Sequence, residues 1–142
     1  MKEVRISVVA QAAHLPHLTA FLQQFWSSAS LPPGECLAFE LALEEMFMNV
    51  VMHGSTEGKS RQVELFLALT PAGLTLTLED DGPGFDPLSL PAPDVTVSVR
   101  DRPVGGLGVF LVRKIMDTVS YSRVGARNQL RMSKRLQQAG AP

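Results

Sequence analysis

The chain of 142 residues has the length of one domain, and its 45% hydrophobic and 19% charged residues give the composition of a globular protein rather than a disordered one. Thirteen Lys and Arg residues against fourteen Asp and Glu residues leave a net charge of −1, which argues against direct nucleic-acid binding. The sequence has no apolar run near the roughly 20 residues of a membrane span, and its N-terminus lacks the apolar core of a signal peptide. We therefore expect one cytoplasmic domain over residues 1–142 that binds neither nucleic acid nor membrane.

The first part of the chain predicts one strand and two helices. Residues 4–10 are rich in Val and Ile, which favours a strand, and residues 17–28 place Leu and Phe on one helical face. The breaker Leu31-Pro32-Pro33-Gly34 ends that helix. A second helix is expected from about Glu35 to His53, with Gly54 at its C-terminal cap.

The rest of the chain predicts four strands, one helix and a long loop. The strands form two hairpins, residues 62–69 with 74–80 and residues 118–124 with 128–136. Residues 83–103 hold five prolines and show little periodicity, which predicts a long loop of the kind that is often functional. The third helix is expected to end near Met116.

Helices and strands alternate too little in this order for a doubly wound parallel sheet. The predicted fold is instead a two-layer α/β sandwich, in which helices pack on one face of a mixed, mostly antiparallel sheet.

The second predicted helix carries a polar line. Glu45, Asn49 and His53 recur every four residues and so share one face. The opposite face is apolar (Phe39, Leu43, Met46, Phe47, Val50), and a further apolar side (Leu41, Met48, Met52) predicts a largely buried helix. Buried polar side chains need partners, which a polar ligand in a cleft would supply. A solvated stripe on an amphipathic helix is the alternative, and the helix by itself does not separate the two.

A second motif, Asp80-x-Gly82-x-Gly84, follows a leucine-alternating strand. A carboxylate at a strand end can accept a hydrogen bond from an exocyclic amine, and glycines let a flat ring approach the main chain. Asp and Gly are also the commonest turn residues, so an acidic turn explains the motif equally well when it is taken alone.

A third motif, Gly105-Gly106-Leu107-Gly108, leads into the third helix. Glycines at a helix N-terminus expose backbone N–H groups and the positive end of the helix dipole, which suits a phosphate. The motif is neither a P-loop nor a dinucleotide fingerprint, and a lone motif of this kind is often only a structural turn.

Together, the three motifs in this order resemble the N, G1 and G2 boxes of the GHKL ATPase superfamily, whose members have the Bergerat nucleotide-binding fold. The resemblance covers about residues 4–136 and places an ATP lid at about residues 85–104. The short length, the His53-Gly54 pair and the segment GGLGVFLVRKIMD are most similar to the anti-sigma-factor serine/threonine kinases.

This resemblance implies roles for individual residues. Glu45 would be the general base, Asn49 would bind Mg²⁺, and Asp80 would accept the adenine 6-amino group. The remaining implied contacts are with ATP: His53 and Arg102 near the phosphates, and Gly82, Gly84, Gly105, Gly106, Leu107 and Gly108 along the nucleotide. Arg102 is placed only loosely, as is Arg100, because Pro103 and Val104 separate both from the glycines.

The resemblance also implies an activity and partners. The chain would be an ATP- and Mg²⁺-dependent protein kinase that phosphorylates an anti-anti-sigma (STAS-type) protein and sequesters a sigma factor, and it could form a homodimer. The alternatives are a switch that binds ATP or ADP and a partner without catalysis, a detached histidine-kinase catalytic domain, and a domain that binds no nucleotide. One departure stands out: many members have a threonine near position 131 that supports the adenine site through water, and Arg131 cannot replace it.

Overall fold

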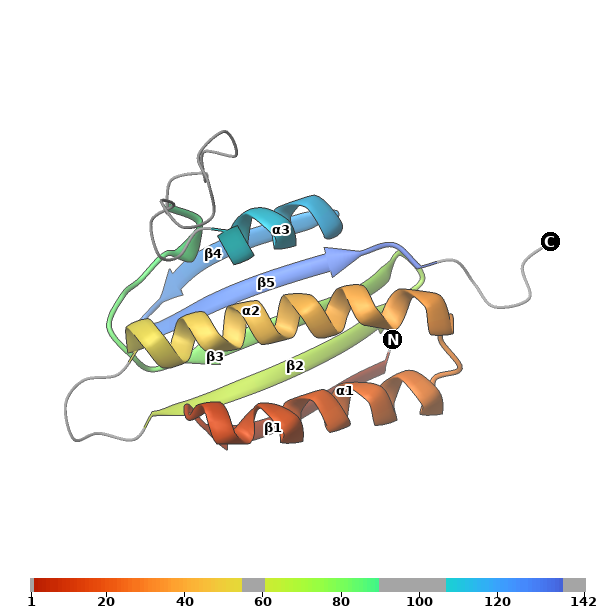
Figure 1. The fold of residues 1–142 in the computed structure, drawn as a ribbon, viewed down its shortest axis with the longest axis horizontal. Helices are drawn as coiled ribbons and strands as arrows, with labels where there is room; N and C mark the ends of the chain where they lie inside the picture. The colour runs from red at the N-terminus through yellow and green to blue at the C-terminus, as the bar shows by residue number, and fades with distance from the viewer. Residues whose placement is uncertain (1, 55–60, 90–106, 137–142) are drawn as a thin grey trace.

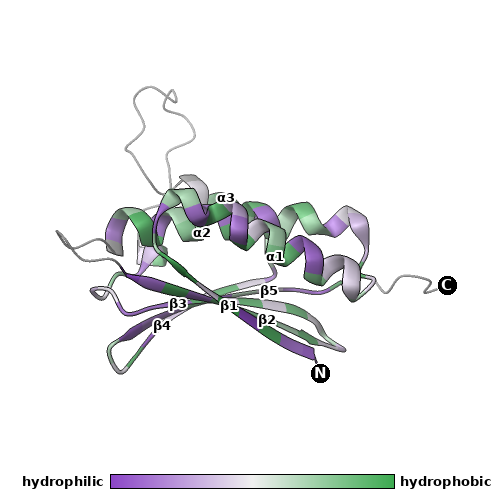
Figure 2. Cartoon of the chain, turned by 90° about the horizontal axis from the view of Figure 1, so that it is seen from below, coloured by the Kyte–Doolittle hydropathy of each residue, from purple (hydrophilic) through white to green (hydrophobic). Residues whose placement is uncertain are grey.

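A computed structural model describes residues 2–54, 61–89 and 107–136, which form two layers (Figure 1). Three helices lie over one face of a five-stranded sheet, and Figure 2 shows these layers edge-on. The elements in chain order are β1 Lys2–Val9, α1 Leu15–Ser28, α2 Cys36–Gly54, β2 Gln62–Thr70, β3 Gly73–Asp80, α3 Leu107–Ile115, β4 Thr118–Val124 and β5 Arg127–Lys134. Three short 3₁₀ turns accompany them, at Ala12–His14, Pro33–Glu35 and Pro87–Ser89.

The strands lie in the order β1-β2-β3-β5-β4. All four pairings between described strands are antiparallel, so this sheet is purely antiparallel where a mixed one was expected. The final hairpin inserts β5 between β3 and β4, and its register places Asn128 opposite Asp80. Two residues far apart in sequence thereby meet at one end of the sheet.

The core lies between the two layers. Inward-facing leucines alternate along β2 and β3, and the ring of Phe47 from α2 is fully buried with them. Polar residues such as Glu64 and Glu79 occupy the outward positions of the same strands. This period of two fixes which face of the sheet receives the helices, because a one-residue slip would bury the polar set.

α2 packs between α1 and α3 on the sheet, and its apolar stripe from Phe39 to Phe47 is buried as predicted. The prediction that its further apolar side is also buried is wrong for Leu41 and Met52, which are 45% and 58% exposed, whereas Met48 is partly buried against the core. The physical reason is that the sheet and two helices cover only part of the circumference, and no described element covers the outward side. α1 also begins at Leu15, two residues before the predicted start.

The single cysteine, Cys36, opens α2. Partial burial, and then the neighbouring Glu40 carboxylate, raise the pKa of its thiol to about 11, so it is protonated at neutral pH. In the described part of the chain, no helix is long and apolar enough to cross a membrane.

Candidate functional site

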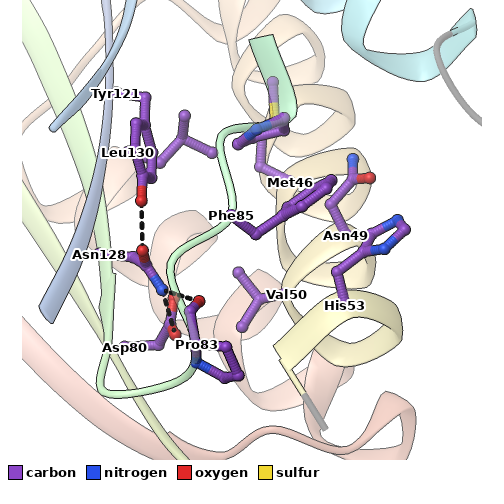
Figure 3. A pocket seen from close by; sticks show the side chains of 11 residues that line it. Met46, Asn49, Val50, His53, Asp80, Pro83, Phe85, Tyr121, Asn128 and Leu130 are labelled. Carbon is purple, nitrogen blue, oxygen red and sulfur yellow. Dashed lines mark hydrogen bonds between the residues drawn. The ribbon is translucent and has the colours of Figure 1, made fainter. Parts of the chain in front are cut away.

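A narrow pocket lies between the C-terminal half of α2 and the segment that follows β3 (Figure 3). Its free volume is about 20 Å³, which is room for one or two water molecules. Its walls come from α2, the end of β3 and the segment after it, β4 and β5: Met46, Asn49, Val50, His53, Asp80, Pro83, Phe85, Pro87, Tyr121, Asn128 and Leu130. Three residues singled out from the sequence, Asn49, His53 and Asp80, therefore line one pocket.

Asp80 ends β3 with only 5% of its surface exposed. Its Oδ1 accepts hydrogen bonds from the backbone N–H of Gly82, at 2.9 Å, and from the side-chain amide of Asn128, at 3.0 Å. The adjacent Asp81 points outward, where its carboxylate lies 4.0 Å from the guanidinium of Arg61. Only the first of the two consecutive acids thus belongs to the pocket, as the motif predicted.

Glu45 lies against the first turn of α3. A Cβ atom built on Gly108 would stand 1.8 Å from the Glu45 Oε2 and 2.6 Å from its Cδ. The N-box and G2-box segments are therefore in direct contact, and the contact exists only because position 108 has no side chain.

Asn49 and His53 continue the polar line of α2 and line the pocket. The Asn49 amide nitrogen donates to the backbone oxygen of Glu45 at 2.9 Å, and its carbonyl oxygen has no hydrogen-bond partner among the described residues. The exposed His53 ring stacks on Phe85, with centroids 4.1 Å apart and planes 16° from parallel. Figure 3 shows the Phe85 ring between α2 and the rest of the pocket wall, so this side chain keeps the pocket narrow.

The predicted glycines differ in their surroundings. Gly82 is buried in the turn after Asp80, whereas Gly84 is exposed. A Cβ atom built on Gly84 would lie 3.7 Å from the side chain of Arg123. Leu107 is the first residue of α3. The predicted phosphate contacts Arg102, Gly105 and Gly106 lie outside the described residues, as does most of the predicted lid.

Arg131, where many members of the family have a threonine, does not line the pocket that contains Asp80. Arg131 is exposed on the sheet face that carries no helices, where it borders a hollow of about 380 Å³. The β5 residue that meets Asp80 is Asn128, three positions earlier, with Tyr121 and Arg123 of β4 bound to it. One signal could have found it: Asn128 precedes Leu130 and Met132 at a period of two, so it is the polar member of the inward face.

The fold is a two-layer α/β sandwich, and its pocket brings the acid at the end of one strand together with polar residues of a helix. A family described as the histidine kinase-like ATPase domain matches residues 8–134, and the chain belongs to this family.

Two known proteins resemble the chain. A protein named serine/threonine-protein kinase BtrW, from Bordetella bronchiseptica, is 32% identical over 99 residues, which cover 68% of this chain and 70% of BtrW. The crystal structure of the RsbU and RsbW domains of Rv1364c from Mycobacterium tuberculosis superposes with a TM-score of 0.70 at 13% identity. That superposition covers 98% of this chain but about a third (34%) of the solved one, and it shows the shared fold.

Proposed function

We propose that this protein is an ATP-dependent protein serine/threonine kinase of the anti-sigma type. In this proposal it phosphorylates an anti-anti-sigma partner of the STAS type and sequesters a sigma factor when that partner is absent. The observation that carries the proposal is the contact between Glu45 and Gly108, because it brings a carboxylate beside a helix N-terminus, and helix N-termini commonly bind phosphate groups. The 32% identity with a serine/threonine-protein kinase supports the same activity.

ATP would enter with its adenine against Asp80 and its phosphates toward α3. The residues fit this group in two respects: Asp80 is an acceptor within the pocket, and Gly82 brings main chain close to it. The pocket is too small for a purine while Phe85 is stacked on His53, so binding requires the Phe85 ring to move away.

Mg²⁺ would bind the carbonyl oxygen of Asn49 together with phosphate oxygens and water, since it prefers hard oxygen ligands and keeps several waters. Bound there, the ion supplies charge neutralisation at the phosphates.

In the transfer step, the hydroxyl oxygen of the acceptor Ser or Thr forms a bond to the γ-phosphorus of ATP. The bond from the γ-phosphorus to the bridging oxygen breaks, and ADP leaves with that electron pair. Glu45 takes the hydroxyl proton, which is the usual contribution of a general base to this reaction.

The test is transfer of labelled γ-phosphate to a purified STAS-type partner. We expect the label to appear on a Ser or Thr of the partner in the presence of Mg²⁺. If the protein binds ADP and the partner but the partner is not labelled, the alternative function, a non-catalytic nucleotide switch, would be favoured over a kinase. The absence of ATP and ADP binding would overturn both.

Asp80→Asn is expected to weaken ADP binding about 10- to 100-fold, because the substitution removes the charged acceptor of a hydrogen bond worth about 1.5–3 kcal/mol. Calorimetric titration with ADP measures the change. Asp81→Asn is the matched control, since this neighbouring acid is exposed and points away from the pocket. Equal affinities for Asp80→Asn and the wild type would remove Asp80 from the binding site.

His53 should report the movement of Phe85. Because its ring stacks on Phe85, its ring protons are shielded in the free protein, and we expect their NMR signals to move downfield when ADP binds. In Phe85→Leu, which has no aromatic ring, the signals should start downfield and move less. Signals that shift equally in both proteins would show that the stack stays closed or that it never shields His53.

A further inference from the structure

Asn128 is a buried polar residue in contact with Asp80, and 6% of its surface is exposed. Its amide nitrogen donates to the Asp80 Oδ1 at 3.0 Å and to the backbone oxygen of Pro83 at 2.9 Å, and it lies 3.4 Å from the Gly82 oxygen. Its carbonyl oxygen accepts from the Tyr121 hydroxyl and, at 3.0 Å, from the Arg123 guanidinium. Figure 3 shows this chain of contacts running from Tyr121 to Asp80.

These contacts use the full hydrogen-bonding capacity of the Asn128 side chain, which has two amide hydrogens and two carbonyl lone pairs. They also fix its orientation, because a flipped amide would face Tyr121 and Arg123 with donors and Asp80 with an acceptor. Asn128 therefore has no group left for a ligand, and any effect it has on a ligand must pass through its neighbours.

Arg123 extends the same network to the turn after β3. Its Nη1 donates to the Gly82 oxygen at 2.8 Å as well as to Asn128. The guanidinium and the Asn128 amide thus hold both the carboxylate of Asp80 and the backbone that follows it. A turn tied at several points keeps the acid in one rotamer.

The consequence for Asp80 is an asymmetry between its two oxygens. Oδ1 accepts two hydrogen bonds, whereas Oδ2 has no hydrogen-bond partner among the described residues, and Asp80 lines the pocket. An ionised carboxylate oxygen is an acceptor only, so it favours a 6-amino purine and disfavours a 6-oxo purine, whose oxygen it would repel.

We propose that Asn128, held by Tyr121 and Arg123, is a positioning residue that directs the free oxygen of Asp80 into the pocket and so sets the preference for a 6-amino over a 6-oxo purine nucleotide. The proposal rests on the nucleotide binding proposed above. It concerns the choice of base, which the kinase activity by itself does not address.

The test compares ADP with inosine diphosphate, which differs at the 6-position, by calorimetric titration of the intact chain. The wild type should bind ADP at least about tenfold more tightly, since an unsatisfied buried acceptor costs about 1–3 kcal/mol. In Asn128→Ala, ADP affinity should fall about tenfold while inosine diphosphate affinity changes less than about twofold. Gln129→Ala, on the other face of β5, should leave the ratio unchanged.

Two further variants separate positioning from folding. Tyr121→Phe removes one donor to Asn128 and should lower the ratio of affinities about threefold without loss of the fold. In an Asp80→Ala background, Asn128→Ala should have no further effect on ADP, because it acts through the absent carboxylate.

The failures of the two proposals are distinguishable. A wild type that binds neither nucleotide overturns the proposed function. A wild type that prefers ADP, with the preference intact in both Asn128→Ala and Tyr121→Phe, overturns only the role of Asn128. If these variants lost affinity for ADP and inosine diphosphate to the same extent, Asn128 would have only a structural role, and the proposed positioning role would also be overturned.

Discussion

Glu45→Gln is expected to lower the rate of phosphoryl transfer to the partner about 10²- to 10⁴-fold, which is the usual contribution of a general base. The amide has nearly the shape of the carboxylate and keeps the packing against Gly108, but it cannot take the hydroxyl proton. The proposed base contacts the hydroxyl of the acceptor and not the nucleotide. ADP affinity should therefore stay within about threefold of the wild type. Single-turnover labelling at saturating ATP, with calorimetry in parallel, measures both quantities.

The chain offers a closely matched control for this substitution. Glu44 is the preceding residue on α2 and is exposed, so Glu44→Gln makes the same chemical change away from the site. It should retain the wild-type rate. If Glu45→Gln retained it as well, Glu45 would not be the base, and the contact with α3 would have to serve nucleotide binding or folding.

The parts of the fold that local pattern controls were predictable. Leucines at every second position specified β3, and the apolar stripe of α2 specified the face that packs on the sheet. The exposed side of α2 was not, because hydropathy along a helix does not tell how many neighbours surround it. Leu41 and Met52 have the same apolar character as the core residues, and only the three-dimensional arrangement leaves them uncovered.

The site divides in the same way. Asp80 could be chosen over Asp81 because the motif Asp80-x-Gly82-x-Gly84 counts its glycines from Asp80. The four-residue spacing of the polar line on α2 singled out Asn49, which lines the same pocket. Asn128 and Phe85 could not be found in this manner. Asn128 reaches Asp80 only through the pairing of β3 with β5, and the stack of Phe85 on His53 depends on the path of an irregular segment. Contacts of this kind depend on topology and loop conformation, which periodicity does not encode.

The contact at Gly108 leads to a second large effect. Gly108→Ala introduces a methyl group where the Glu45 carboxylate now lies, and atoms 1.8 Å apart cannot coexist. The carboxylate is the end of a flexible side chain, so rotation of Glu45 relieves the clash at little cost to the fold. Alanine is also the better helix former by about 1 kcal/mol, which offsets part of that cost. We therefore expect the free energy of unfolding to change by no more than about 1 kcal/mol.

Catalysis should respond very differently to Gly108→Ala, because a displacement of about 1 Å in a reacting group can cost about 10²-fold in rate. We expect a loss of about that size in single-turnover labelling, with normal thermal unfolding. Gly34→Ala is the control, since its added methyl would meet no atom within 4 Å. The loss should also vanish in a Glu45→Gln background, because both substitutions would then act on the same group. A wild-type rate in Gly108→Ala, or full additivity with Glu45→Gln, would mean that the position of Glu45 against α3 does not govern the transfer step.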